Sequence, residues 1–298
     1  MTRDDLYASV TASIVEALET GTRPWAPRWD KGAGASLGAL PLRSTGEAYR
    51  GVNVLLLWGV AMVKGYQQPR WMTFKQALEQ GAAVRKGEKG ARVVKAGRLT
   101  RDAGEGQTGD ENGQVHIPFL KGYTVFNVEQ IDGLGAGWFE AAAPVLPEPA
   151  RDAAADAFFA ATGARVQHGG AVACYAPSTD QLHMPPLAAF TNLEAYYATL
   201  AHEFVHWTGH KSRLDRAGGK RFADRGYAFE ELVAEIGAAF VCASLGVSAQ
   251  PRDDHAAYVA SWLKTLKGDP RAIFTAASAA QAAADFLHAQ AQPLAAAA

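Results

Sequence analysis

The chain contains 298 residues, of which 48% are hydrophobic and 20% are charged, so it is long enough to bury the cores of two ordinary domains. Its formal net charge of −1 gives no indication of a partner. The longest apolar run, VNVLLLWGVAMV, has 12 residues and is too short to span a bilayer as a helix.

Two further features predict a cytoplasmic protein. The N-terminal stretch MTRDDLYASV carries two acids and lacks an apolar core, so we expect no signal peptide. Cys174 and Cys242 lie in unrelated contexts and are expected to be buried free thiols, as in a reducing compartment. We therefore expect no membrane partner.

The first half is predicted to combine helices with a β-hairpin. Apolar residues recur every four positions over 6–20, which predicts a helix that ends at Gly21. Strands are expected in ARVVKAG and in HIPFLKGYTVFNV, and the polar insertion between them, residues 101–114, is expected to be a mobile loop. The other two helices expected here cover residues 53–64 and 73–80, the second capped by Thr73.

The second half is predicted to be mostly helical, with short strands within 164–175. Thr191 and Glu194 form a capping-box pattern ahead of a helix that continues to Trp207, with Gly209 as its terminator. The remaining helices are expected at 151–162, 228–245 (closed by Gly246), 253–266 and 272–291.

These patterns predict an α+β fold of two domains. The first would cover residues 1–135 and contain a small antiparallel sheet. A segment rich in Gly, Ala and Pro predicts a linker at 136–150, and the second, mostly helical domain would cover 151–298.

The stretch HEFVHWTGH, residues 202–210, predicts a metal site. His202 and His206 lie four apart on a predicted helix, so both imidazoles project from one face and can bind one ion. Glu203 is rotated by about 100° and can reach a water on the metal, where a carboxylate acts as a general base. Two histidines on a helix face are also often ordinary polar residues.

A catalytic zinc site needs a third protein ligand, and His210 does not suit that position. On a continuous helix it would lie about 12 Å along the axis from His202, and the metzincin pattern would need a histidine where this chain has Ser212.

The downstream run YAFEELVAEIGAAF offers an alternative: Glu231 and Glu235 share a helix face, while Glu230 is expected to point elsewhere. The run resembles the Glu-x-x-x-acid helix of gluzincin metallopeptidases. That resemblance implies Glu231 as the third ligand and Glu235 as the partner of a ligand histidine. The reverse order, and two acids on a solvated face, remain open.

Other side chains near the motif are weaker candidates. Tyr227 and His210 could stabilise an oxyanion, although a packing role and a helix cap are the alternatives. Arg213 and Arg216 could bind an anionic substrate group, or belong to a solvated loop. Zinc is the expected cofactor, and manganese and iron suit the same ligands.

The first half is predicted to bind single-stranded DNA. From residue 43 to residue 101 there are twelve Lys or Arg against three acids, and tryptophans interleave with them. A basic groove with stacking aromatics is how proteins hold single strands, although a solvated turn and core tryptophans are the alternatives. Trp58 is expected in the core. The candidate DNA-binding residues are Trp25, Trp29, Arg50, Trp71, Arg85, Lys86, Lys89 and Arg92.

The motifs together resemble a known family. The order YRGVN, WMTFKQA, RKGEKG, TLAHEFVHWTGH, SRLDR and YAFEELVAEIGAAF, within about residues 5–250, is similar to the ArdC-type antirestriction proteins of conjugative plasmids. The first domain also resembles the front part of TraC-type primases. The resemblance implies an N-terminal domain that binds single-stranded DNA and a C-terminal zincin-like (gluzincin-type) metallopeptidase domain, which together protect incoming plasmid DNA from restriction.

Three hypotheses follow from the residues and the resemblance. The chain is an antirestriction protein with a competent peptidase, a DNA-coating protein with a silent metal site, or a plain metallopeptidase with an incidental basic domain. Double-stranded DNA remains open as a further partner. The peptidase substrate is an unknown protein, and a restriction-modification component is one option.

Overall fold

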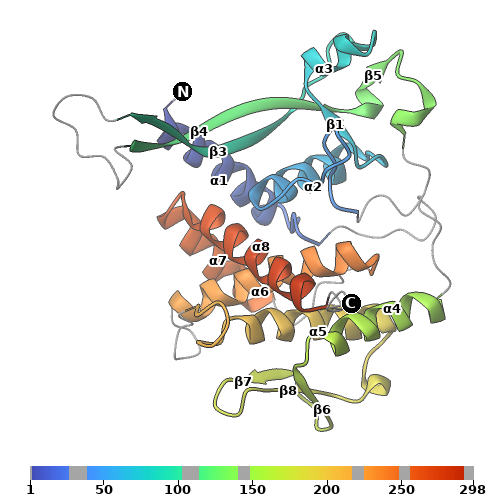
Figure 1. Cartoon of the computed structure of the whole chain (residues 1–298), viewed down its shortest axis with the longest axis vertical. Coiled ribbons are helices and arrows are strands. Elements are labelled where there is room, and N and C mark those ends of the chain that lie inside the picture. The colour runs from blue at the N-terminus through green and yellow to red at the C-terminus, as the bar shows by residue number, and fades with distance from the viewer. Residues whose placement is uncertain are drawn as a thin grey trace.

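The computed structural model describes residues 2–26, 39–102, 114–139, 148–216, 225–247 and 256–291. Figure 1 shows the N-terminal helices under a long β-hairpin, with the C-terminal helices stacked beneath them and a small sheet at the far end. The α+β fold with a small antiparallel sheet is therefore confirmed. No helix within the described ranges is both long and apolar enough to cross a membrane.

The N-terminal helices form where the sequence predicts them. Helix α1 (Arg3–Glu19) starts at a capping box between Thr2 and Asp5. It buries the apolar residues that recur every four positions, from Leu6 to Leu18. Helix α2 (Val52–Lys64) ends at Gly65, whose φ of 72° is the left-handed conformation that glycine adopts readily. Helix α3 (Phe74–Glu79) is capped by Thr73, as predicted.

The hairpin is longer than expected. Strands β3 (Ala91–Asp102) and β4 (Gln114–Asn127) pair antiparallel in one continuous register, from Ala91 opposite Val125 to Asp102 opposite Gln114. Residues 101, 102 and 114, which were predicted to lie in a mobile loop, belong to the strands, and residues 103–113 of that predicted loop lie outside the described residues. The remaining N-terminal elements are β1 (Trp71–Met72) on the other edge of β4, β2 (Ala83–Val84) paired with β5 (Ile131–Asp132), and the 3₁₀ turns η1 (Val128–Gln130) and η2 (Ala136–Trp138).

The C-terminal half contains a three-stranded sheet that was only partly predicted. Strand β6 (Arg165–His168) runs parallel to β8 (Gln181–Met184), and β7 (Cys174–Ala176) pairs antiparallel with β8. Strand β8 was not predicted from the sequence. The helical elements are α4 (Glu148–Ala161), the 3₁₀ turn η3 (Leu187–Ala189), α5 (Leu193–Thr208), α6 (Arg225–Leu245), α7 (Ala256–Gly268) and α8 (Ala272–Ala291).

The cap of α5 differs by one residue from the prediction. The N-cap is Asn192, whose side chain accepts a hydrogen bond from the backbone N–H of Ala195 at 2.8 Å. The predicted capping box of Thr191 and Glu194 is therefore wrong, because the asparagine already provides the acceptor for the first turn.

The two halves share one hydrophobic core. The Thr11 hydroxyl of α1 donates to the carbonyl of Pro270 at 2.6 Å, and the ring of Trp25 meets that of Trp262 edge-on. At the start of α2, the backbone N–H of Gly51 donates to Gln281 of α8 at 3.0 Å. Helix α8 thus contacts α2 as well as α5 and α6.

Candidate metal centre

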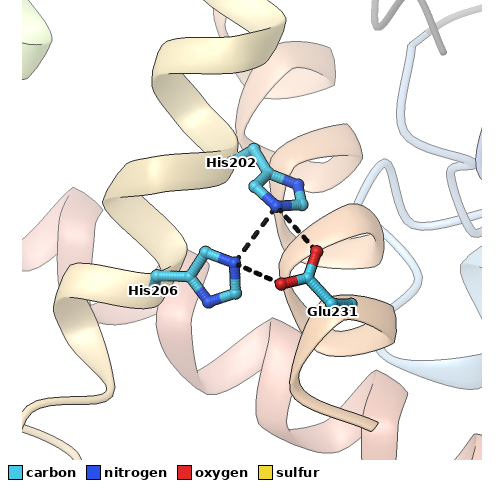
Figure 2. A group of neighbouring side chains, drawn as sticks. All are labelled: His202, His206 and Glu231. Carbon is cyan, nitrogen blue, oxygen red and sulfur yellow. Dashed lines mark hydrogen bonds and ion pairs between the residues drawn. The ribbon is translucent and has the colours of Figure 1, made fainter. Parts of the chain in front are cut away.

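Helices α5 and α6 bring three candidate ligands together (Figure 2). The Nε2 atoms of His202 and His206 lie 3.1 Å apart. The Glu231 carboxylate spans both rings, with Oε2 3.4 Å from Nε2 of His202 and Oε1 3.4 Å from Nε2 of His206. Two imidazoles and a carboxylate form the donor set typical of a catalytic zinc site.

A glycine allows the two helices to approach closely at this point. A Cβ placed on Gly237 of α6 would lie 2.8 Å from a methyl group of Val205 of α5, next to His206. The absence of a side chain at Gly237 therefore sets how near Glu231 comes to the two histidines.

Two further glutamates face the other nitrogen of each ring. Oε1 of Glu235 lies 3.5 Å from Nδ1 of His202, and Oε1 of Glu230 lies 3.4 Å from Nδ1 of His206. The expectation that Glu230 points elsewhere is wrong, because the packing of α6 on α5 turns it toward His206. Carboxylates in such positions fix the orientation and tautomer of a ligand histidine. The geometry favours Glu231 over Glu235 as the third ligand.

The electrostatics of this cluster fit a cation. Burial by itself lowers the pKa of His206, but the carboxylates of Glu230 and Glu231 outweigh it and raise the pKa to about 10. Burial raises the pKa of Glu231, yet the two histidines outweigh it and hold that pKa well below its usual range. Three carboxylates and one guanidinium, that of Arg216, surround the buried ring of His202 and the partly buried ring of His206. The remaining excess of negative charge is one that a divalent cation would balance in place of protons.

Glu203 lies beside this group on a neighbouring face of α5. It is 4% exposed, and its Oε2 accepts a hydrogen bond from the backbone N–H of Tyr175 in β7 at 2.9 Å. Strand β7 therefore holds the carboxylate in place.

The cysteine predictions are half right. Cys174, on the same strand as Tyr175, is exposed rather than buried, and partial desolvation of its thiol, followed by the charge of Glu203, raises its pKa. Cys242 is buried as predicted, and burial raises its pKa to about 12.

Arg213 and Arg216 are each paired with an acid. Arg213 donates to both carboxylate oxygens of Asp180, at 2.5 and 3.0 Å, and its guanidinium lies 4.0 Å from the ring centroid of Trp207. Arg216 donates to both oxygens of Glu230, at 2.8 and 3.2 Å. Both guanidinium groups are largely buried and occupied by acids, so the expectation of a solvated loop is wrong, and a contact with an anionic substrate group stays a prediction.

Of the two candidate oxyanion donors, Tyr227 lies nearer the ligands. Burial, with hydrogen bonds to Tyr258 and Glu231, raises the pKa of Tyr227 and keeps its hydroxyl protonated. His210 lies beyond the end of α5, where its Nδ1 accepts the backbone N–H of Ser212 at 3.2 Å. It is not part of the ligand group found among the described residues.

The predicted stacking tryptophans are mostly not available to a ligand. Trp25 and Trp71 are each 1% exposed and belong to the core, so their prediction as stacking residues is wrong. The neighbouring proline and arginine residues in the sequence do not indicate whether a tryptophan ring is buried in the core or exposed on the surface. Trp58 is buried, as predicted, and Trp29 lies outside the described residues.

The predicted basic side chains are exposed. Arg50 pairs with Asp285 of α8, and Arg85 donates to Glu88 at 2.9 Å. Lys86, Lys89 and Arg92 also lie on the surface. Exposed aromatic rings on β4 were missed, although the alternation in HIPFLKGYTVFNV already placed Phe119 and Tyr123 on one face of a strand.

The geometry can now be compared with known proteins. Residues 4–126 match the model of the N-terminal domain of the anti-restriction factor ArdC, and residues 153–279 match a zincin-like metallopeptidase model. A crystal structure of the antirestriction protein ArdC from the R388 plasmid, in metal-free form, is 50% identical, covers 96% of this chain and 98% of its own, and superposes with a TM-score of 0.79. This chain belongs to the ArdC antirestriction family. The Mn(II)-bound form of the same ArdC protein is 47% identical with a TM-score of 0.78, covering 97% of this chain and 99% of its own.

Two curated relatives match nearly the whole of this ArdC family member. An uncharacterized protein y4eC of Sinorhizobium fredii is 44% identical over 97% of this chain and 93% of its own length. The DNA primase TraC of Escherichia coli is 40% identical over 94% of this chain, which spans only 27% of that primase. The zincin-like fold implies a divalent metal, and the chain offers His202, His206 and Glu231 to hold one.

Proposed function

We propose that this chain is an antirestriction protein that binds single-stranded DNA through its N-terminal domain and protects incoming conjugative plasmid DNA in the cytoplasm. Its C-terminal domain would be a zinc-dependent metallopeptidase. The observation that carries the enzymatic part is the convergence of His202, His206 and Glu231 beside the buried Glu203. The family membership supports the DNA-binding part.

The residues divide the chemistry among them. A divalent cation held by the three ligand side chains would polarise a peptide carbonyl and lower the pKa of water. Glu203, fixed by the N–H of Tyr175, would take a proton from the attacking water and pass it to the leaving amine. The Tyr227 hydroxyl, protonated at neutral pH, would donate to the developing oxyanion.

The metal is proposed to be zinc, although the related ArdC protein has been solved with Mn(II) and iron also suits these ligands. Elemental analysis of the purified protein, followed by reconstitution with each metal, tests this. One equivalent of zinc in the parent and none in Glu231→Ala is the expected result. The absence of any metal, with none taken up on addition, would end the assignment.

The catalytic step is tested by Glu203→Gln, which keeps the side chain's shape but removes the base. We expect metal content to be retained and protection of transferred plasmid DNA to fall, while Glu194→Gln, in the first turn of the same helix, serves as the control. If Glu203→Gln protects as well as the parent, the protein protects by coating DNA and its metal site is silent.

The DNA-binding step needs a separate measurement. Full-length protein should shift a labelled single strand, and the affinity should fall steeply as salt rises. No shift at low salt would favour the plain metallopeptidase. Proteins cleaved in the presence of single-stranded DNA, restriction-modification components first among them, can be sought by comparing parent and Glu203→Gln. The shift assay, repeated with labelled duplex DNA, tests double-stranded DNA as the second proposed nucleic-acid partner.

A further inference from the structure

One face of the β3–β4 hairpin carries Lys95 and Tyr123, and it is exposed except at its base, where Ala91, Val93 and Val125 are buried in the core. Residues directly opposite in the continuous register share a face, so one face of the ribbon collects alternate residues of both strands. The other face packs on the helices below: a Cβ on Gly122 would lie 3.3 Å from Leu6 of α1. Figure 1 shows the hairpin lying across α1. We call the exposed part of the face with Lys95 and Tyr123 the outer face and define it by Lys95, Leu99, Ile117, Phe119, Lys121 and Tyr123.

The outer face exposes large apolar side chains. Leu99 is 58% exposed and lies directly opposite Ile117, at 38%. Phe119 and Tyr123 are 37% and 36% exposed. A row of four such side chains on a two-stranded ribbon is the kind of surface that marks a binding site.

The two rings are held in place. Phe119 lies opposite Gly97, where a Cβ would come within 2.7 Å of the ring, so the ring rests against the glycine. The Nζ atom of Lys121 lies 5.4 Å from the ring centroid of Tyr123. Each ring is therefore restrained by a neighbouring residue while part of it stays exposed. This restraint lowers the side-chain entropy that is lost when a ligand stacks on the ring.

The charges on the hairpin favour an anion. The described residues of β3 and β4 include five Lys or Arg and a single acid, Asp102. On the outer face Lys95 and Lys121 lie directly opposite each other. Like charges in that position destabilise a sheet, and an anionic ligand between them would remove the repulsion.

The outer face also leads into a cavity. Lys95 and Tyr123 line a cavity of about 850 Å³ whose opposite side carries Arg43, Arg50 and the start of α2 at Gly51. Glu47 and Asp285, which pair with these two arginines, line the same cavity, so the excess of positive charge lies on the hairpin side.

We propose that the outer face of the β3–β4 hairpin is the stacking platform for single-stranded DNA, with bases on Phe119 and Tyr123 and phosphates at Lys95 and Lys121. This rests on the proposed function, in which the N-terminal domain binds a single strand. A single strand is the occupant that uses both features, because it presents free base faces together with a charged backbone, whereas a duplex hides its base faces. The two rings, four residues apart on β4, are separated by about 13 Å, so each receives a different base.

The test measures binding of full-length protein to a labelled oligothymidine by fluorescence anisotropy over a series of salt concentrations. Phe119→Leu and Tyr123→Leu keep an apolar group but remove the ring, and each should weaken binding by about tenfold. Phe119→Tyr should bind like the parent. Lys121→Gln should lower the slope of log affinity against log salt by about 0.7.

Phe139→Leu is the matched control, because Phe139 is 38% exposed but lies outside the hairpin. It should bind like the parent, and thermal unfolding should show that all variants fold alike. If the parent binds and both Leu variants of the platform bind as tightly as the Phe139 control, the platform assignment is overturned and the DNA lies elsewhere. The same result is expected if the outer face binds a protein instead of DNA, so this alternative also overturns the assignment. If the parent itself does not bind, the proposed function fails together with the platform.

Discussion

Gly237→Ala should loosen the metal centre while leaving the fold intact. The new methyl group would lie 2.8 and 3.0 Å from the two methyl groups of Val205, whereas carbon atoms in contact normally lie about 3.5 to 4.0 Å apart. Val205 is 0% exposed and β-branched, so it has almost no other rotamer on a helix. Helices α5 and α6 must therefore separate by roughly 1 Å at this contact.

That separation is large compared with the tolerance of the site. Glu231 lies on α6 and approaches both histidines of α5 at 3.4 Å, and metal–ligand distances tolerate only about 0.2 Å. We expect the affinity for zinc to fall at least tenfold, as on loss of an outer-shell partner. Overpacking would destabilise the metal-free protein by about 1 to 3 kcal/mol, and the better helix propensity of alanine would offset about 1 kcal/mol of that.

Zinc affinity would be measured by competition with a chromophoric chelator, and stability by urea unfolding of metal-free protein. Gly59→Ala is the control: it is also a glycine inside a helix, but its nearest neighbour would be Pro24 at 3.8 Å. That variant should gain about 1 kcal/mol of stability and bind zinc normally. Adding Val205→Ala to Gly237→Ala should recover part of the zinc affinity. If Gly237→Ala binds zinc like the parent, the close approach of the helices does not set the ligand geometry.

Three further predictions follow from the contacts around the site. Glu230→Gln should lower zinc affinity by about tenfold or more, because the amide orients His206 less firmly; unchanged affinity in the chelator assay would remove Glu230 from the site. The pKa of Asp180 is lowered to about 2, first by its hydrogen bonds with Arg213, so the stability it contributes should be full above about pH 4 and lost as pH falls through about 2. Because Asp180 is 37% exposed, Asp180→Asn should cost only about 1 kcal/mol at pH 7, and equal unfolding curves at pH 7 would contradict this. In native protein a thiol reagent should modify Cys174 and leave Cys242 unmodified until urea is added, with the rate at Cys174 rising above neutral pH because its pKa is raised; two fast thiols in native protein would contradict the burial of Cys242.

The predictions that held depend on local periodicity. The spacing of His202 and His206 places both rings on one face of any helix. The apolar residues that recur every four positions in α1, and the alternation in β3 and β4, can likewise be recognised from residues that are close in the sequence. The pairing of Glu231 with the histidines was also predicted, but it came from a resemblance between helices rather than from spacing. The domain boundaries at 135 and 150 stay a prediction.

Apart from the capping box at Thr191, which was wrong by one residue, the predictions that failed depend on which surfaces meet. Glu230 faces His206 because of the way α6 packs on α5. The orientation of α6 relative to α5 cannot be derived from the sequence of α6 alone. Trp25 belongs to the core because Trp262 of α7 packs on its ring, and Trp71 because β1 places its ring in the core beside Tyr66. The proline and basic residues next to them in the sequence do not reveal these contacts. The sequence by itself therefore determined which side chains share a face of each element. Only the tertiary structure decided which faces are covered, because burial results from contacts between residues far apart in the chain.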